Sequence, residues 1–272
     1  MLYPAVSSSR IEKGINTMDL QLTDQVVFIA GSSRGIGRGI AQAFLAEGAR
    51  IVLTGRDQAS LLATQTELAA PEKILAIPGD FTQPTVIQQA FDRTLQHFGK
   101  IDHLIANLGT GAGTPGPFPP AEDWTRLFEM NFFASVRLTE AILPHFQKQN
   151  SGTILYISSI AAVEATPAPL PYSSAKAALN LYAKNLSRQV AANNIRVNSL
   201  CPGNIYFPGG GWERRIAARR EAVESMLEKE VPQKRFGTPQ EIAAFAVWLT
   251  SPAASFATGG TYVVDGGQTR SI

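Results

Sequence analysis

The sequence predicts an α/β protein built on a single doubly wound parallel sheet with helices on both faces. Short, nearly continuous apolar runs rich in β-branched residues recur along the chain, as expected for strands that are buried on both faces. Longer segments with helical periodicity separate these runs, and no internal repeat or linker divides the chain. A chain of 272 residues, 44% of them hydrophobic, can bury a sizeable core in one such domain.

The expected strands follow one another in chain order and are short. They are residues 26–30, 50–54, 73–77, 101–106, 153–157, 195–200 and 261–264. The expected helices run from about Ser33 to the breaker Gly48, after the N-cap Asp57, and over 84–99, 122–149 and 172–193. Residues 1–17 are expected to be a flexible extension or the result of translation from an upstream start, so the domain spans 18–272. A substrate loop is expected at about 203–230, and its first part, 203–215, is an irregular insertion.

Charge and composition limit the class of protein. Lys plus Arg is 24 and Asp plus Glu is 22, a near-balance that argues against a dedicated nucleic-acid binder. No apolar run approaches the length of a membrane span, and residues 1–17 lack the apolar stretch of a secretory signal. The single cysteine, Cys201, excludes an intrachain disulfide framework, which favours a reducing compartment such as the cytoplasm.

The first expected strand leads into a glycine-rich turn, Gly31-Ser32-Ser33-Arg34-Gly35-Ile36-Gly37. Gly31 permits a tight turn, Gly35 lets a pyrophosphate approach the backbone, and Gly37 lets the next helix pack closely on the strand. The N-terminus of that helix points free N–H groups at a phosphate. The spacing G-x3-G-x-G is not the commoner G-x-G-x-x-G. Its place between a strand and a helix nevertheless predicts cofactor binding rather than an ordinary turn.

Tyr172 and Lys176 lie four residues apart in an expected helix, so they share one face. A nearby positive charge favours the phenolate, which lowers the pKa of the tyrosine and makes it a usable acid or base. The same spacing occurs by chance in many helices, as a half-buried tyrosine and a solvated lysine. The pair therefore indicates chemistry only in combination with other motifs.

The two motifs, in this order and at this distance, resemble the short-chain dehydrogenase/reductase family, and the resemblance covers about Asp19 to Ile272. It implies a Rossmann-like sheet of about seven parallel strands. Other family landmarks occur in the expected order. They are Asp80-Phe81, Asn107-Leu108-Gly109, Asn131, Ser159, Pro202-Gly203, and a C-terminal signature at 237–242, 258–259 and 264–267.

The resemblance implies a mechanism for hydride transfer between a nicotinamide and a carbonyl or alcohol carbon. Tyr172 exchanges the proton, Ser159 donates a hydrogen bond to the substrate oxygen, and Lys176 lowers the pKa of the tyrosine and holds the ribose. Asn131 is expected to hold a water that links Lys176 to solvent. The expected cofactor contacts are Gly31, Ser33, Arg34, Gly35, Ile36, Gly37, Arg56, Asp80, Phe81, Asn107, Gly109, Tyr172, Lys176, Pro202, Gly203 and Ile205.

The end of the second expected strand favours NADP(H) over NAD(H). NAD-preferring family members carry an acidic residue where this chain has Gly55, and Arg56 follows it. Arg56 and Arg34 are expected to clamp a 2′-phosphate through charge-assisted hydrogen bonds. The alternative is that Arg56 stacks on the adenine and both cofactors bind, and the neighbouring Asp57 keeps this alternative open.

Three positions depart from the family pattern. Ala30 replaces the threonine before the first glycine, and Ala106 replaces the first asparagine of N-N-A-G. Phe207 stands where the family has a threonine that contacts the carboxamide. The orientation of the nicotinamide must therefore be secured in another way, such as by backbone groups or by Ile205.

The expected activity is NADPH-dependent reduction of a ketone, with a β-ketoacyl thioester as one candidate, because the C-terminal signature is similar to that of β-ketoacyl carrier-protein reductases. The alternatives are oxidation of a secondary alcohol or sugar alcohol and, from another class, a non-catalytic nucleotide sensor. His97, His103 and His145 are widely separated, so no metal site is expected. The resemblance implies a homotetramer that pairs residues 122–149, 172–193 and the last strand.

Residues 206–215 are expected to form a mobile lid over the substrate. Gly209, Gly210 and Gly211 lose much backbone entropy on ordering. The aromatic residues Tyr206, Phe207 and Trp212 flank these glycines and could exclude water on closure. The alternative is a rigid loop held by Pro208 and by packing of Trp212.

Overall fold

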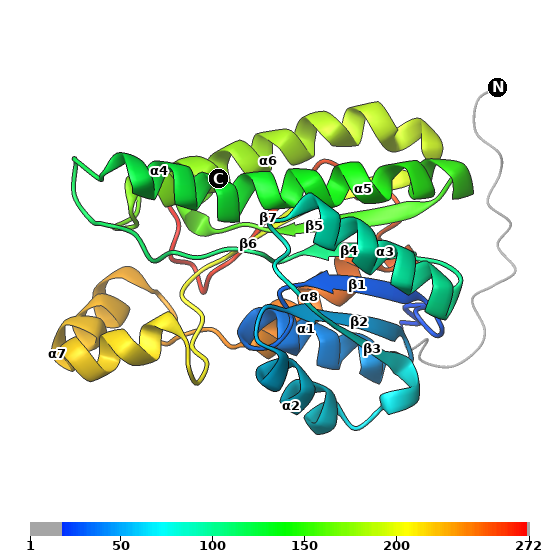
Figure 1. Cartoon of the computed structure of the whole chain (residues 1–272). Helices are drawn as coiled ribbons and strands as arrows, with labels where there is room; N and C mark the ends of the chain where they lie inside the picture. Colours follow the sequence, from blue (N-terminus) through cyan, green and yellow to red (C-terminus); the bar gives the residue numbers. More distant parts are fainter. Residues whose placement is uncertain (1–17, 271–272) are drawn as a thin grey trace, which may run out of the picture.

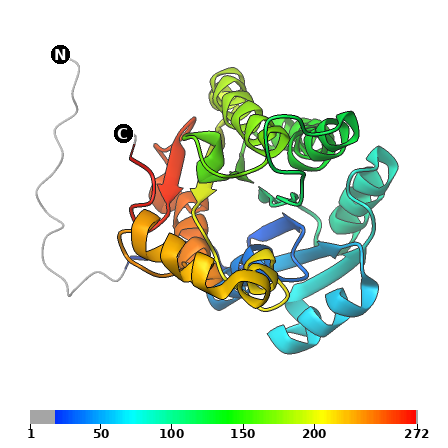
Figure 2. The same ribbon diagram turned by 90° about the vertical axis from the view of Figure 1, so that its left-hand side faces the viewer.

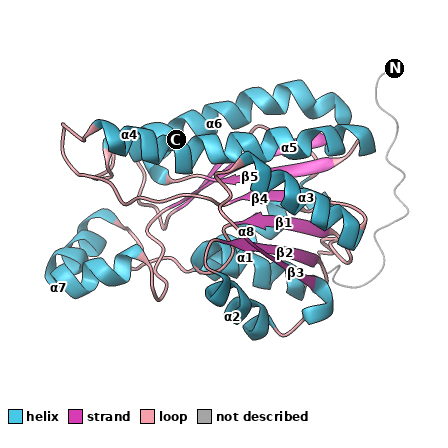
Figure 3. Ribbon diagram, in the orientation of Figure 1, coloured by secondary structure: helices cyan, strands magenta, loops and turns pink. Residues whose placement is uncertain are grey.

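The computed structural model describes residues 18–270, so the expected extension 1–17 lies outside the described residues. A seven-stranded sheet with the order β3-β2-β1-β4-β5-β6-β7 forms the centre of the described chain (Figure 3). All six neighbouring pairs are parallel. The strands are β1 Val26–Ala30, β2 Arg50–Gly55, β3 Ile74–Pro78, β4 His103–Ala106, β5 Gly152–Ile157, β6 Ile195–Pro202 and β7 Thr261–Val264. The predicted fold class is confirmed.

Helices cover both faces of the sheet (Figure 1). One face carries α1 (Gly35–Ala46), α2 (Gln58–Leu68) and α8 (Pro239–Thr250). The other face carries α3 (Pro84–Phe98), α4 (Ala121–Phe128), α5 (Ala134–Gln149) and α6 (Leu170–Val190). Each face has its own cluster of buried apolar side chains, as the continuous apolar strands require. Among the described residues, none of the helices is long and apolar enough to span a membrane.

Strands β1 and β4 lie side by side although β2 and β3 separate them in the chain. The chain therefore runs outward from β1 to β3 and then returns to the other side of β1. In sheets of this kind, the crevice at such a reversal, beyond the carboxyl ends of the strands, is where ligands bind.

Local signals explain where several helices begin and end. The predicted N-cap Asp57 accepts a hydrogen bond from the N–H of Ser60 at 2.8 Å. Gly99 ends α3 with φ of 78°, a left-handed value that suits glycine. Helix α8, which the sequence analysis did not predict, begins with a reciprocal capping box between Thr238 and Glu241.

The predicted helix 122–149 is not continuous. A π-helical turn, η2 (Glu129–Phe133), separates α4 from α5. A π-turn leaves no mark in the apolar periodicity because it inserts a single extra residue into one turn.

Most of the predicted substrate loop 203–230 is helical, because Gly211–Glu230 form helix α7. The role of this segment in substrate binding stays a prediction. Among the α7 residues only Val223 is buried, so the helix shows no apolar stripe that would reveal it. Figures 1 and 2 show α7 beyond the carboxyl ends of the strands, outside both helical layers. The rest of the predicted loop contains a turn in which the N–H of Gly210 donates to the carbonyl of Phe207 at 3.1 Å. The mobility of this segment stays a prediction.

Candidate active site

The glycine-rich turn lies between β1 and α1, at the crevice between β1 and β4. Gly31 has φ of 77° and Gly35 has φ of 56°, both in the left-handed region that glycine tolerates. A Cβ on Gly37 would lie 2.1 Å from the carbonyl oxygen of Gly31, so no larger residue fits there. The side-chain N–H of Asn107, after β4, donates to the same carbonyl at 2.7 Å and joins the turn to the neighbouring strand.

The N-terminus of α1 is open to an anion. Arg34 is the N-cap residue, but its side chain makes no capping hydrogen bond, and the first turn contains no acidic residue. The first N–H groups of a helix have no partner within the helix, and the helix dipole favours negative charge there. This end of α1 therefore fits a phosphate group.

A hollow of about 280 Å³ extends from this turn across the carboxyl ends of β1, β2 and β4. Many of the predicted cofactor residues line it. They are Gly31, Ser33, Arg34, Ile36, Arg56, Asp80, Phe81, Asn107 and Gly109. Six further residues line the hollow that were not predicted as cofactor contacts, which are Gly55, Gly79, Thr82, Leu108, Met130 and Phe207. Gly79 and Thr82 flank the predicted Asp80, so proximity along the chain was the signal that could have found them.

The ring of Phe207 lies against the glycine-rich turn. A Cβ on Gly35 would be 2.6 Å from the ring carbon Cζ of Phe207. From the sequence, Phe207 was expected only to remove a hydroxyl beside the nicotinamide. The structure instead places its aromatic ring at the glycine where the pyrophosphate was expected to approach.

At the far end of the hollow, β2 ends in Gly55. A Cβ on Gly55 would lie 3.1 Å from the Cβ of Ser33, so a longer acidic side chain would crowd that serine. Arg34 and Arg56 are both exposed at this end. The carboxylate of Asp57 is engaged as the N-cap of α2, where hydrogen bonds from Ser60 lower its pKa. Two cationic side chains and one hydroxyl therefore face this end of the hollow.

The predicted catalytic side chains come from three elements around the ends of β4 and β5. Ser159 follows Ser158 after the end of β5 and caps a short 3₁₀ turn, η3 (Ile160–Ala162). Tyr172 and Lys176 lie in the first two turns of α6. The ammonium of Lys176 donates to the carbonyl of Ile157 at 2.8 Å and to that of Leu108 at 3.5 Å. The lysine thus joins the carboxyl ends of both strands.

The predicted lowering of the tyrosine pKa by Lys176 stays a prediction. Burial raises the pKa of Tyr172, and a hydrogen bond with Ser159 acts in the opposite direction. Burial also lowers the pKa of Lys176 to about 8. The lysine donates to backbone carbonyls, so the phenol and the ammonium are two separately desolvated groups.

Asn131 occupies the centre of the π-helical turn and is fully buried. Its amide group donates to the carbonyls of Thr110 at 3.0 Å and Leu127 at 2.9 Å, and accepts from the N–H of Thr110 at 3.1 Å. The side chain therefore joins the backbone after β4 to the backbone of α4. The expected water at Asn131 stays a prediction.

The predicted cofactor residues Pro202, Gly203 and Ile205 lie at the end of β6 and directly after it. Pro202 ends this strand, and a Cβ on Gly203 would lie 2.7 Å from the Cβ of Asp265 after β7. The N–H of Tyr206 donates to the carbonyl of Gly237 at 3.0 Å, beside a bridge between Ile205 and Gly237. This segment is held against the start of α8, and none of these predicted residues lines the hollow.

The chain is similar in sequence to a known protein family and to individual members of it. A family model described as "Enoyl-(Acyl carrier protein) reductase" matches residues 30–269. Glucose 1-dehydrogenase 2 of Bacillus subtilis (strain 168) is 32% identical over 252 residues, which are 91% of this chain and 96% of that relative.

Two solved structures are also similar. A 7α-hydroxysteroid dehydrogenase complexed with NADH and 7-oxo glycochenodeoxycholic acid is 30% identical with a TM-score of 0.84, over 93% of this chain and 97% of that chain. The L-sorbose reductase of Gluconobacter frateurii, complexed with NADPH and L-sorbose, is 31% identical with a TM-score of 0.86, over 94% and 100%.

The fold and these relatives define an oxidoreductase that acts on CH–OH or C=O groups. The chain belongs to the short-chain dehydrogenase/reductase family, as the sequence motifs predicted.

Proposed function

We propose that this protein is an NADP(H)-dependent oxidoreductase that interconverts a ketone and a secondary alcohol, with Tyr172 as the proton donor and acceptor. One observation carries the proposal. Ser159, Tyr172 and Lys176 gather at the carboxyl ends of β4 and β5, beside a glycine-rich turn that fits a pyrophosphate. A bound nicotinamide supplies or accepts the hydride, and the protein's side chains manage the proton and the charge.

Each side chain has a distinct role in the proposed reaction. The raised pKa of Tyr172 keeps the phenol protonated, which suits proton donation to a carbonyl oxygen during reduction. The hydroxyl of Ser159 donates a hydrogen bond to the same oxygen as negative charge develops there. Below pH of about 8, the buried ammonium of Lys176 adds a positive charge in a site of low dielectric constant. A nicotinamide ribose is the proposed second partner of this ammonium.

The polar groups at the end of β2 support NADP(H) as the preferred cofactor. Arg34 and Arg56 are exposed beside the hydroxyl-bearing Ser33, which suits a 2′-phosphate. The carboxylate that kept the alternative open, Asp57, is bound to the start of α2. The similar L-sorbose reductase was solved with NADPH, whereas the 7α-hydroxysteroid dehydrogenase was solved with NADH.

A sugar, a sugar alcohol or another secondary alcohol is the proposed substrate class. Glucose 1-dehydrogenase, L-sorbose reductase and 7α-hydroxysteroid dehydrogenase are all named for such compounds. A β-ketoacyl thioester is the second candidate. It is favoured by the C-terminal sequence signature and by a family description that names an acyl carrier protein.

The experiment is a comparison of the parent protein with Tyr172→Phe. Initial rates are measured with NADPH and NADH against L-sorbose, a 7-oxo bile acid and acetoacetyl-CoA, and in the reverse direction with glucose. The variant is expected to lose turnover by about 10²–10⁴-fold, the usual contribution of a positioned acid or base. Its affinity for NADPH, measured by calorimetry, is expected to stay within about twofold. Near-normal turnover in Tyr172→Phe would contradict the mechanism, and NADPH binding without turnover in the parent would favour the nucleotide sensor.

We also propose a homotetramer and a reducing compartment such as the cytoplasm. Trp124 is exposed on α4, Phe133 in the π-turn η2 and Leu181 on α6. Val263 is exposed on the edge strand β7. Exposed large apolar side chains on two separate surfaces suit two different contacts between copies. The single cysteine, Cys201, is buried and unpaired, which is compatible with a reducing environment.

A further inference from the structure

The segment Gly109–Thr114, which we call the glycine ribbon, leads away from β4 and passes the catalytic side chains. Its composition is Gly-Thr-Gly-Ala-Gly-Thr, so every second residue is a glycine. A Cβ on Gly109 would lie 2.7 Å from Oδ1 of Asn131 and 3.2 Å from Nζ of Lys176. The start of the ribbon is therefore in direct contact with two of the predicted catalytic residues.

The other end of the ribbon touches the beginning of α6. A Cβ on Gly113 would lie 3.1 Å from the Cβ of Pro169 and 2.7 Å from Leu127 on α4. The carbonyl of Pro169 in turn accepts the N–H of Tyr172 at 3.0 Å. A shift of the ribbon would therefore change the positions of both Lys176 and the turn that carries Tyr172.

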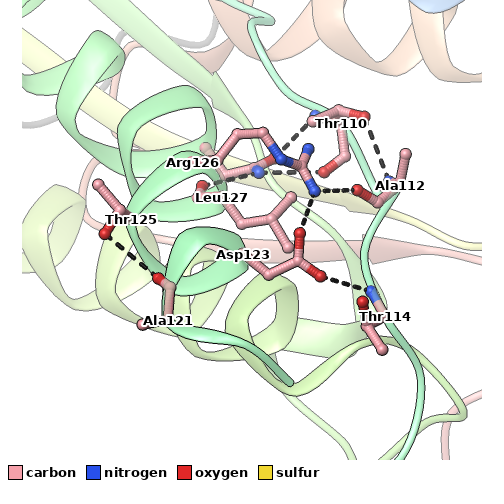
Figure 4. A network of polar contacts seen from close by, with 9 residues as sticks. Thr110, Ala112, Thr114, Ala121, Asp123, Thr125, Arg126 and Leu127 are labelled. Atoms are coloured by element: carbon pink, nitrogen blue, oxygen red, sulfur yellow. Dashed lines mark hydrogen bonds and ion pairs between the residues drawn. The ribbon is translucent and has the colours of Figure 1, made fainter.

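The three residues that alternate with the glycines are tied to α4 and the π-turn after it (Figure 4). The backbone N–H of Thr110 donates to the side chain of Asn131 at 3.1 Å, and the carbonyl of Thr110 accepts from that side chain at 3.0 Å. The carbonyl of Ala112 accepts from Nη2 of Arg126 at 2.6 Å. The N–H of Thr114 donates to Oδ2 of Asp123 at 2.7 Å. Alternate residues of the ribbon are therefore fixed along its whole length.

Asp123 and Arg126 also hold each other. Nη2 of Arg126 lies 2.5 Å from Oδ1 of Asp123, and the Asp123 side chain is 12% exposed. The N–H of Thr114 and the guanidinium of Arg126 together lower the pKa of Asp123 to about 2. The carboxylate is consequently ionised at every pH at which the protein is expected to work.

We propose that Asp123 and Arg126 are positioning residues that hold the glycine ribbon as a wall of the active site. The inference rests on the proposed function, because it concerns the placing of Lys176, Asn131 and the substrate. A Cβ on Gly111 would meet no atom within 4 Å, so this residue has free space beside it.

The expected consequence of losing the pair is larger for catalysis than for stability. A partly exposed ion pair usually contributes little to folding stability. A displacement of about 1 Å near the reacting groups can cost on the order of 10²-fold in rate. The activity and the melting temperature should therefore respond very differently to the same substitution.

The kinetic test uses Asp123→Ala and Arg126→Ala, with Arg50→Ala as the matched control. Arg50 pairs with Asp24 at 3.0 Å, at the amino ends of β1 and β2. Both test variants are expected to lower kcat/KM for the carbonyl substrate by about tenfold or more. The control variant, and binding of 2′,5′-ADP to all variants, should stay within about twofold. Asp123→Asn, whose amide oxygen still accepts the N–H of Thr114, should recover part of the loss.

The structural test is hydrogen exchange of the amides of Thr110 and Thr114, followed by NMR, and it needs no turnover. The Thr114 amide is expected to exchange about tenfold faster in Asp123→Ala because it loses its acceptor, while the core strands stay protected. If the parent protein reduced no carbonyl compound, the proposed function would fail but this prediction would stand. Unchanged exchange at Thr114, or kcat/KM within twofold of the parent in both alanine variants, would overturn the proposal. Should Asp123→Ala fail to fold, Asp123→Asn and Arg126→Lys serve in its place.

Discussion

At the scale of single residues, burial governs the protonation of the groups around the ends of β4 and β5. Burial raises the pKa of Tyr172 and lowers that of Lys176 to about 8. The two carbonyls that accept from Lys176 cannot neutralise it, so its positive charge acts strongly on whatever occupies the site. Arg34 and Arg56, at the other end of the hollow, are exposed, so solvent and salt screen their charges.

Arg56→Asp is expected to weaken the preference for NADPH. The substitution removes a charge-assisted hydrogen bond to the 2′-phosphate and adds a repulsive charge, so kcat/KM for NADPH should fall by about 10–100-fold. Steady-state kinetics with NADPH and NADH measure the ratio. Arg93→Asp, an exposed position on α3, makes the same change in net charge and should leave the ratio unchanged. Equal kcat/KM values for the two cofactors in the parent protein would refute the assigned preference.

His103 is expected to make the protein less stable in acid. The imidazole is buried at the start of β4, neither ring nitrogen has a hydrogen-bond partner, and burial lowers its pKa from 6.5 to about 4. Between these two values the unfolded chain binds a proton that the folded chain does not. The contribution of His103 to the free energy of unfolding is therefore complete above pH 6.5. As the pH drops towards 4, the free energy of unfolding falls by on the order of 3 kcal/mol.

Urea unfolding at pH 7.5, 6.0 and 5.0 measures this effect. His103→Leu is expected to flatten the dependence over that range, because the group that gains the proton on unfolding is gone. His97→Leu is the control, since His97 is exposed on α3 and should leave the dependence as it is in the parent. A parallel acid dependence in the parent and His103→Leu would show that other groups cause it.

At the scale of elements, strands were predictable and irregular turns were not. The apolar runs at β1, β2 and β5 mark their strands to within two residues, because strands buried on both faces need continuous apolar sequence. In the π-turn, the side chain of Asn131 bonds to the backbone of Thr110, which lies in a distant segment. Asp123 and Arg126 were missed for the same reason. Their partners are backbone groups of the glycine ribbon, and such partners have no side-chain signature.

The glycine-rich turn and the segment after β6 meet at Phe207, and this contact gives a prediction at the same scale. A pyrophosphate at Gly35 needs space that the ring borders, so Phe207→Thr is expected to tighten NADPH binding several-fold. Binding of 2′,5′-ADP, which lacks the nicotinamide half, should change less. Calorimetry with both ligands separates the two effects. Weaker NADPH binding in Phe207→Thr would instead assign the ring a supporting role under the cofactor.

At the scale of the whole molecule, the exposed apolar side chains give the last prediction. Phe133 is 44% exposed and Leu181 is 63% exposed, on helices that also carry the catalytic residues. Multi-angle light scattering at micromolar concentration is expected to give four times the 29.2 kDa mass of the chain. Phe133→Glu together with Leu181→Glu should shift the mass downward, whereas Leu62→Glu on α2 should not. A monomeric parent would exclude the proposed assembly.

The separation of α7 from both helical layers has a consequence for evolution. With only Val223 buried, this helix shares little apolar surface with the sheet, so its sequence can diverge without loss of the fold. The glycine-rich turn and the ends of β4 and β5 have no such freedom, because their backbones contact one another closely. Descendants of this chain should therefore acquire new substrates mainly through changes in residues 211–230, while the machinery for hydride transfer is inherited unchanged.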